Sequence, residues 1–177
     1  MHRYLCGLAA ATALFSLPAV ADAAEAAVAT LTTADGREVG SVSLLPASFP
    51  GLILTFEASG MPAGTHGFHL HETGTCDPSD GFKSAGGHWN PTDHSHGWLD
   101  GEGAHAGDMP NIHVPESGEL TIEYFLPDLA LGDGGGAANV MDADGTAIIV
   151  HSGVDDYLSQ PSGEAGDRIA CGVVEMN

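Results

Sequence analysis

Histidines are the residues in this chain best suited to chemistry, because ten of them occur among 177 residues. Two of them, His69 and His71, lie two positions apart in an apolar segment. If that segment is a strand, both side chains point to one face, where two imidazoles can bind one metal ion. A His-x-His pair alone is a weak signal, because chance or core packing explains many instances.

A long polar stretch, residues 72–110, supplies more candidate ligands. They are His88, His94, His96, His105 and Asp108, and His151 ends a later apolar segment. Imidazoles combined with one carboxylate suit zinc or copper, whereas calcium and magnesium prefer oxygen ligands. The alternative, which composition alone leaves open, is a set of solvated loop histidines.

The elements that must position these histidines are expected to be strands. Short apolar or alternating segments, separated by glycine, proline and aspartate, indicate an all-β protein. The expected strands are 29–33, 39–45, 52–58, 66–71, 111–114, 120–125, 147–150 and 169–174. No segment keeps a 3.6-residue apolar period, so little helix is expected. About eight antiparallel strands with two long loops, 72–110 and 152–167, predict a Greek-key β-barrel or sandwich with its function on the loops.

The composition limits the classes of function. The chain carries 24 Asp and Glu against 4 Lys and Arg, a formal net charge of −20. Such a surface repels phosphate, so the chain is not expected to bind nucleic acid through a basic face. Hydrophobic residues make up 43% of the chain, which favours one folded domain over a disordered chain.

Residues 1–21 have the pattern of a cleaved secretory signal peptide. Arg3 precedes the apolar run 5–17, and Ala19-Val20-Ala21 is the small-residue pattern expected before the cleavage site. The apolar run is too short to span a bilayer, so no membrane anchor is expected. The mature domain is therefore expected to be residues 22–177, and its location periplasmic or secreted.

Removing the signal peptide changes both the charge and the cysteine count. One arginine and Cys6 are lost but no acid, so the net charge becomes 3 − 24 = −21. The remaining cysteines, Cys76 and Cys171, are an even number in an exported chain, for which one disulfide is the default prediction. Two buried free thiols are the alternative.

Six blocks, in this order, resemble the copper/zinc superoxide dismutase family in its exported bacterial form. They are His66-Gly67-Phe68-His69-Leu70-His71-Glu72, Ser84-Ala85-Gly86-Gly87-His88-Trp89-Asn90-Pro91, His96-Gly97, His105-Ala106-Gly107-Asp108, Ile149-Val150-His151 and Arg168-Ile169-Ala170-Cys171-Gly172-Val173. Any one block could arise by chance, but the ordered set is specific, and the resemblance extends over residues 28–177.

The resemblance implies two metal sites that share a residue. Copper would be bound by His69, His71, His88 and His151, and zinc by His88, His96, His105 and Asp108. Asp155 would link one copper histidine to one zinc histidine through its carboxylate. Cys76 would pair with Cys171 near Arg168. His66 matches a structural position of the family, and His94 and His113, which match no ligand, are expected at the surface.

The resemblance also implies an antioxidant enzyme that converts superoxide to dioxygen and hydrogen peroxide in the exported compartment. Its cofactors would be one copper and one zinc per chain, and copper would be alternately reduced and reoxidised, because zinc has no accessible second oxidation state. His88 would be both ligand and acid/base, and Arg168 would bind the superoxide anion. The family includes monomers and homodimers, so a homodimer is one of two expected states.

Three other functions would use parts of the same sequence: a non-enzymatic accessory module, a metal-storage protein, and an adhesion sandwich with incidental histidines. The presence of all seven ligands and of Arg168 favours the enzyme. Its substrate is an anion, however, and the mature chain has only Arg37, Lys83 and Arg168 as basic residues. We therefore predict a weaker or atypically salt-dependent rate of superoxide capture.

Overall fold

The computed structural model describes residues 25–132 and 136–177, and the predicted signal peptide, residues 1–21, lies outside the described residues. The described chain is almost entirely β-structure, which confirms the predicted fold class. In this part of the chain the only helical segments are two 3-10 turns in the first long loop, Pro78–Asp80 and Lys83–Ala85. No helix among the described residues is long and apolar enough to cross a membrane.

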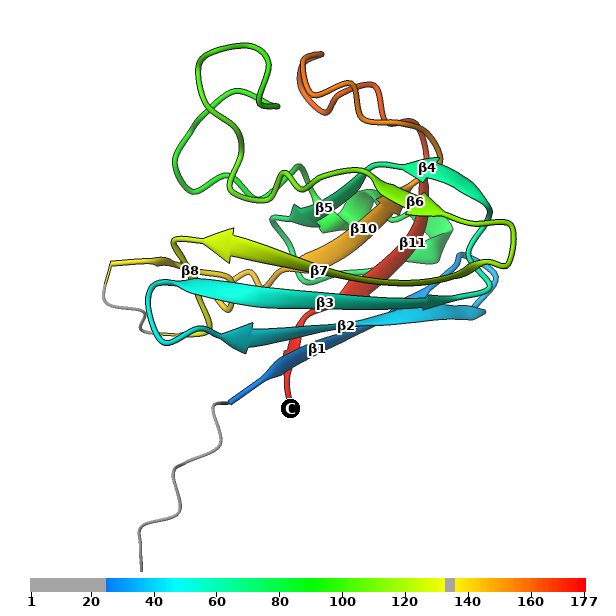
Figure 1. Ribbon diagram of the computed structural model, residues 1–177, viewed down its shortest axis with the longest axis horizontal. Helices are drawn as coiled ribbons and strands as arrows, with labels where there is room; N and C mark the ends of the chain where they lie inside the picture. The colour runs from blue at the N-terminus through cyan, green and yellow to red at the C-terminus, as the bar shows by residue number, and fades with distance from the viewer. Residues whose placement is uncertain (1–24, 133–135) are drawn as a thin grey trace, which may run out of the picture.

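One curled antiparallel sheet dominates the molecule (Figure 1). The strands of the described residues are β1 Ala27–Thr32, β2 Glu38–Pro46, β3 Gly51–Ser59, β4 Gly64–His66, β5 Phe68–His71, β6 Ile112–Val114, β7 Glu119–Pro127, β8 Leu129–Ala130, β9 Ala138–Asn139, β10 Ala147–His151, β11 Arg168–Val173 and β12 Glu175–Met176. The large sheet has the order β5-β10-β11-β1-β2-β3-β7, with β12 paired to β1. Two small sheets, β4–β6 and β8–β9, accompany it.

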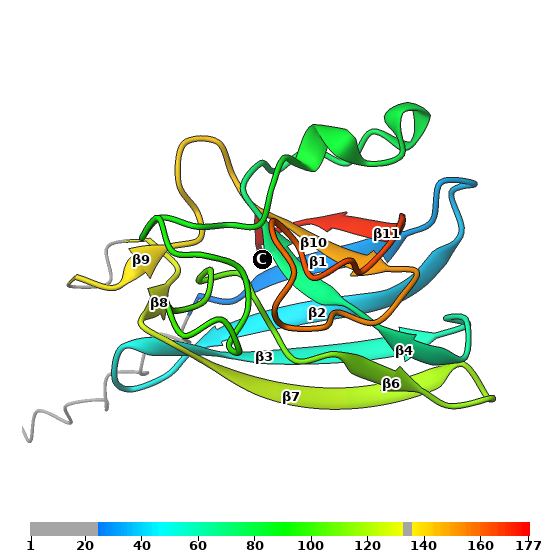
Figure 2. The ribbon, with the colours of Figure 1, turned by 90° about the horizontal axis from the view of Figure 1, so that it is seen from above.

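The curl brings β5 and β10 over β2 and β3, and the core lies between them. On β3 the inward residues Leu52, Leu54 and Phe56 are buried, while alternate positions are more exposed. Phe56 stacks on Phe68 of β5 with ring centroids 5.2 Å apart, which joins the two halves of the curled sheet. Every residue of β5 and β10 is buried, because the two long loops cover their outer face (Figure 2).

The prediction of one strand over residues 66–71 is wrong, because the chain forms β4 and β5 in different sheets. Gly67 lies between them and donates its N–H to Gly153 O at 2.8 Å, while its carbonyl accepts from the His151 N–H at 2.8 Å. A Cβ at Gly67 would lie 2.8 Å from the Ala165 Cβ. The second long loop therefore packs against the chain at this glycine and interrupts the strand.

The predicted disulfide between Cys76 and Cys171 is present, with the two Cα atoms 5.8 Å apart. It ties the first long loop to β11. Arg168, at the start of β11, donates from both terminal nitrogens to the carbonyl oxygens of Phe82 and Gly86, each at 2.6 Å. The segment that precedes His88 is thus fixed to the sheet by one covalent and two hydrogen-bonded contacts.

Candidate metal centre

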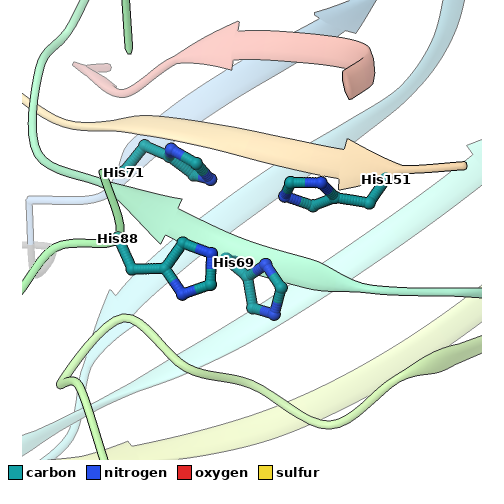
Figure 3. Close-up of side chains that lie close together, drawn as sticks. All are labelled: His69, His71, His88 and His151. Carbon is teal, nitrogen blue, oxygen red and sulfur yellow. The ribbon is translucent and has the colours of Figure 1, made fainter. Parts of the chain in front are cut away.

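Four buried histidines converge above the outer face of β5 and β10 (Figure 3). His69 and His71 come from β5, His151 from the end of β10, and His88 from the first long loop. One ring nitrogen of each lies within 4.8 Å of the corresponding nitrogens of the others. We name this group and the next one after the metals that the sequence resemblance implies, and call these four residues the copper group. The antiparallel pairing of β5 with β10 brings the two strands together, and a backbone bridge between His71 and His88 delivers the fourth ring.

A second group shares His88 and lies within the first long loop. It consists of His88, His96, His105 and Asp108, whose candidate ligand atoms also lie within 4.8 Å of one another. We call these residues the zinc group. Asp108 Oδ1 lies 2.7 Å from His88 Nδ1, and Oδ2 accepts the backbone N–H of Gly97 at 2.9 Å. One carboxylate therefore contacts a ring and also fixes the loop backbone.

The first long loop is held against β5 by backbone hydrogen bonds. Leu70 donates its N–H to Gly107 O at 2.9 Å and accepts from the Trp89 N–H at 2.8 Å. A Cβ at Gly107 would lie 2.4 Å from Leu70 O, so this close approach requires glycine. These backbone hydrogen bonds to β5 hold the loop next to the sheet and fix the positions from which His88 and Asp108 project.

The ring nitrogens that point away from the copper group have hydrogen-bond partners. His69 Nε2 contacts Asp155 Oδ2 at 2.7 Å, His71 Nδ1 contacts Gly86 O at 3.0 Å, and His151 Nδ1 contacts Gly166 O at 3.3 Å. Such contacts set the tautomer and orientation of a ligating imidazole. Asp155 Oδ1 also lies 3.0 Å from His96 Nε2, so one carboxylate links the copper group to the zinc group.

Six buried ring nitrogens in the described part of the chain have no hydrogen-bond partner. They are His69 Nδ1, His71 Nε2, His88 Nε2, His96 Nδ1, His105 Nδ1 and His151 Nε2. All six belong to the copper and zinc groups. Buried polar atoms are costly without a partner, and a metal ion would be a partner for each of these lone pairs. Imidazole nitrogens with a single carboxylate are the donor set that copper and zinc prefer, so the residues present fit both ions.

The two groups differ in their electrostatics. Burial lowers the pKa of His69 to about 4 and that of His151 to about 3, and it holds the pKa of His71 well below its usual value. Burial also disfavours a charge on His96, but the negative charges of Asp108, 3.1 Å from Nδ1, and Asp155, 3.0 Å from Nε2, outweigh it and raise the pKa of His96 to about 9. In the metal-free protein His69, His71 and His151 are therefore neutral at pH 7, while zinc must displace a proton from His96.

The same hydrogen bonds act on the two carboxylates. Burial alone would raise the pKa of Asp108, but contacts with His88 and His96 outweigh it and hold that pKa far below the usual range. The pKa of Asp155 is lowered in the same way by its contacts with His69 and His96. Both carboxylates are thus ionised at any pH at which the protein would bind a metal cation.

A cavity of about 510 Å³ opens over the copper group. Its lining includes His71, His88, His151 and Arg168, together with the acids Glu72 and Asp93. Arg168 is the one basic residue in this lining, and Lys83 is not part of it. An anion that enters the cavity therefore meets one fixed guanidinium beside the copper group.

Comparison with known proteins decides the family. The family model described as copper/zinc superoxide dismutase (SODC) matches residues 39–174. The chain belongs to the copper/zinc superoxide dismutase family. The resemblance seen in the six sequence blocks is therefore confirmed.

Named members of the family match most of the chain. A "Superoxide dismutase [Cu-Zn] 1" of Aquifex aeolicus is 45% identical over 141 residues, which are 79% of this chain and 82% of the relative. A "Superoxide dismutase [Cu-Zn]" of Caulobacter vibrioides is 39% identical over 150 residues, which are 84% of this chain and 85% of the relative. The crystal structure of a SOD-like protein from Bacillus subtilis matches with a TM-score of 0.76 and 37% identity, covering 82% of this chain and 96% of that chain.

Among residues 25–132 and 136–177, three histidines of this superoxide dismutase family member lie outside both groups. His66 is buried, with its ring nitrogens 2.8 Å from His151 O and 3.0 Å from Pro62 O. His94 and His113 are exposed, in agreement with the prediction that they are surface residues.

Sequence reasoning missed Asn111, which supports the metal groups. The buried side chain of Asn111 donates to Asp155 O at 2.8 Å and accepts from the Asp155 N–H at 2.9 Å. It thereby fixes the backbone of the carboxylate that links the two groups. The only sequence signal was an amide residue next to the apolar residues of β6, and this is common at strand ends.

Proposed function

We propose that this protein is a superoxide dismutase that converts two superoxide anions and two protons into dioxygen and hydrogen peroxide. Family membership and the named relatives support this activity. The observation that carries the proposal is the sharing of one imidazole. His88 Nε2 belongs to the copper group, while His88 Nδ1 lies 2.7 Å from Asp108 in the zinc group.

The six unpartnered nitrogens support the ligand assignment that we propose, and His88 Nδ1 and the Asp108 carboxylate complete it. Copper would be held by His69 Nδ1, His71 Nε2, His88 Nε2 and His151 Nε2, and zinc by His88 Nδ1, His96 Nδ1, His105 Nδ1 and the Asp108 carboxylate. When bound, copper supplies one-electron redox chemistry next to the cavity, and zinc has none to supply. The sheet and the disulfide-bonded loop hold the donor atoms in place.

His88 and Arg168 have direct roles in this proposal. His88 lines the cavity, so when its Nε2 is not bound to copper that nitrogen can hold a proton taken from solvent, which it would release to the reduced oxygen species before it binds copper again. Arg168 binds the anion, because its guanidinium is fixed by Phe82 O and Gly86 O at the cavity wall. Burial lowers the pKa of Arg168, yet a guanidinium remains charged at neutral pH.

Metal analysis combined with a superoxide-consumption assay tests the function. We expect one copper and one zinc per chain, high activity, and loss of activity when copper is removed. Full metal occupancy without turnover would overturn the catalytic proposal. Sedimentation of the same preparation separates monomer from homodimer.

A second candidate function is copper and zinc binding without turnover. The structural likeness to a Bacillus subtilis protein named only as SOD-like favours it. The two candidates differ in the fate of superoxide, because a binding module would hold both metals and leave the superoxide decay rate unchanged.

We infer that residues 1–21 are a cleaved signal peptide and that the domain of residues 22–177 is exported to the periplasm or the medium. The signal pattern supports export, and so does the disulfide, because disulfides persist in oxidising compartments. Sequencing the N-terminus of protein from the exported fraction tests this. An N-terminus at Asp22 is expected, and a chain that keeps Met1 and stays in the cytoplasmic fraction would contradict it.

A further inference from the structure

The two long loops meet at the backbone of His96, whose ring belongs to the zinc group. The Gln160 side chain accepts the His96 N–H through Oε1 at 2.9 Å and donates from Nε2 to His96 O, also at 2.9 Å. A carboxamide turned end for end would place donor against donor and acceptor against acceptor. The two contacts therefore fix the amide in one orientation and occupy both backbone polar groups of one residue.

Neighbouring contacts align the loops on either side of this residue. Leu99 donates its N–H to Tyr157 O at 3.1 Å, and the rings of Trp98 and Tyr157 lie 5.2 Å apart. A Cβ at Gly97 would lie 2.1 Å from Tyr157 O, so the two backbones approach as closely as glycine allows. In Figure 1 the two loops rise side by side from the same side of the sheet. Residues 96–99 and 157–160 form a short loop-to-loop ladder.

His96 is consequently held by the second loop at two separate places. Asp155 contacts the ring at Nε2, and Gln160 contacts the backbone N–H and carbonyl. The ring and the backbone together determine where His96 Nδ1 points. That nitrogen is one of the unpartnered atoms of the zinc group.

We propose that Gln160 is a positioning residue for His96, and that zinc retention depends on the closure of the second loop through this carboxamide. The inference rests on the proposed zinc site and concerns its control. Pro161 and Ser162, which follow Gln160, line the cavity over the copper group. Zinc binding and the shape of the cavity wall are therefore coupled through adjacent residues of one loop.

Gln160→Met and Gln160→Glu separate positioning from loop packing. Methionine has about the same length and bulk but forms neither hydrogen bond. Glutamate keeps the acceptor for the His96 N–H but replaces the donor that faces His96 O. Asp156→Ala is the matched control, because Asp156 accepts the backbone N–H groups of Leu158 and Ser159 and stabilises the same loop without contacting His96.

The measurement is the rate at which zinc passes from the copper- and zinc-loaded protein to a chromophoric chelator. We expect Gln160→Met to release zinc about tenfold faster or more, since outer partners of metal ligands typically contribute 10–100-fold to affinity. Gln160→Glu should also release zinc faster, and Asp156→Ala should stay within about twofold of the wild type. With Co²⁺ in place of zinc, the visible spectrum should shift in the two Gln160 variants and not in the control.

A zinc release rate and a cobalt spectrum that are unchanged in both Gln160 variants would overturn the inference. An equal change in Asp156→Ala would also overturn it, because loop stability alone would then explain the effect. The experiment gives a different result if the proposed zinc site itself is wrong. A wild-type protein that binds no zinc would refute the proposed zinc site itself, whereas wild-type binding that is indifferent to Gln160 refutes only the positioning role.

Discussion

At the scale of single residues, the histidines of the metal groups divide their ring nitrogens between two tasks. One nitrogen of His69, His71 and His151 is free toward the copper group, and the other contacts an oxygen of Asp155, Gly86 or Gly166. The ligand set is therefore preorganised by groups that are themselves not ligands. Asp155 has the largest share in this, because its two oxygens reach one ring in each group.

Asp155→Asn should weaken zinc binding while the fold is kept. An amide has one oxygen to accept from His69 or His96, and its NH₂ then opposes the N–H of the other ring. We expect zinc affinity to fall about 10–100-fold, as measured by chelator competition. Asp156→Asn makes the same charge change one residue away and should leave the affinity near that of the wild type. Unaltered zinc affinity in Asp155→Asn would contradict the linking role.

The metal-free protein should lose stability as the pH falls from about 6.5 to 4, the window between the unfolded and folded pKa values of the buried histidines. His69 and His151, with pKa values of about 4 and 3, stay neutral when folded but protonate on unfolding, so the unfolded state binds more protons. The upper limit is about 1.4 kcal/mol per pH unit for each such histidine.

His96 does not contribute to the loss of stability between about pH 6.5 and pH 4. Its pKa of about 9 keeps His96 protonated in the folded state throughout this window. In the unfolded state the ring gains its proton as the pH falls through about 6.5. The stability that His96 contributes is therefore full below about pH 6.5 and is lost as the pH rises toward 9. Asp108 and Asp155, whose pKa values are lowered, add to the loss of stability near and below pH 4. Thermal unfolding of the metal-free protein at several pH values measures the sum, and a midpoint that is constant from pH 6.5 to 4.5 would contradict the lowered pKa values of His69 and His151.

At the scale of elements, β5 and β10 carry three of the histidines of the copper group, and the two long loops pack over the outer face of these strands. Short apolar or alternating segments bounded by turn residues predicted most strands to within two residues, because both signals are local properties of the sequence. The break at Gly67 was missed because it depends on Gly153 and Ala165, which reach the site from the second loop. The Gln160 and Asn111 contacts were missed for the same reason, since their partners are 64 and 44 residues away.

The candidate ligands were predictable for a different reason. Their identity follows from ordered motifs that each keep a short local spacing, such as His69-Leu70-His71 and His105-Ala106-Gly107-Asp108. The motifs do not predict which ring nitrogen of each histidine points toward the other members of its metal group. That choice depends on backbone carbonyls such as Gly86 O and Gly166 O, and any residue type at those positions has a carbonyl.

Replacing both cysteines, with Cys76→Ser and Cys171→Ser, should destabilise the fold and slow superoxide capture. The disulfide closes a loop with a sequence separation of 95, for which the chain-entropy estimate of stabilisation is about 4.7 kcal/mol. The same loop carries Phe82 O and Gly86 O, which fix Arg168, so kcat/KM should fall as well. Denaturant unfolding with and without reductant measures the first effect. Equal midpoints for the variant and the oxidised wild type would contradict it.

At the scale of the whole molecule, the acidic surface and the anionic substrate oppose each other. The chain has a formal charge of −20, and the cavity over the copper group has Arg168 as its one basic lining residue against Glu72 and Asp93. Long-range interactions with an anion are repulsive, and the attraction from Arg168 is confined to the cavity. Salt weakens the long-range repulsion more than the short-range attraction of Arg168, because screening acts over about 10 Å at 0.1 M ionic strength.

The value of kcat/KM should therefore stay level or rise as ionic strength increases from about 0.01 to 0.3 M, because salt screens the distant acids more than the short-range attraction of Arg168. Asp93→Asn should raise kcat/KM at low salt, since it removes a negative charge from the cavity lining. Glu57→Gln, on the exposed face of β3, changes the net charge equally and should have a smaller effect. A steep fall of kcat/KM with salt would mean that long-range attraction exists despite the net charge. Equal effects of the two substitutions would mean that the total charge, and not the cavity, governs capture.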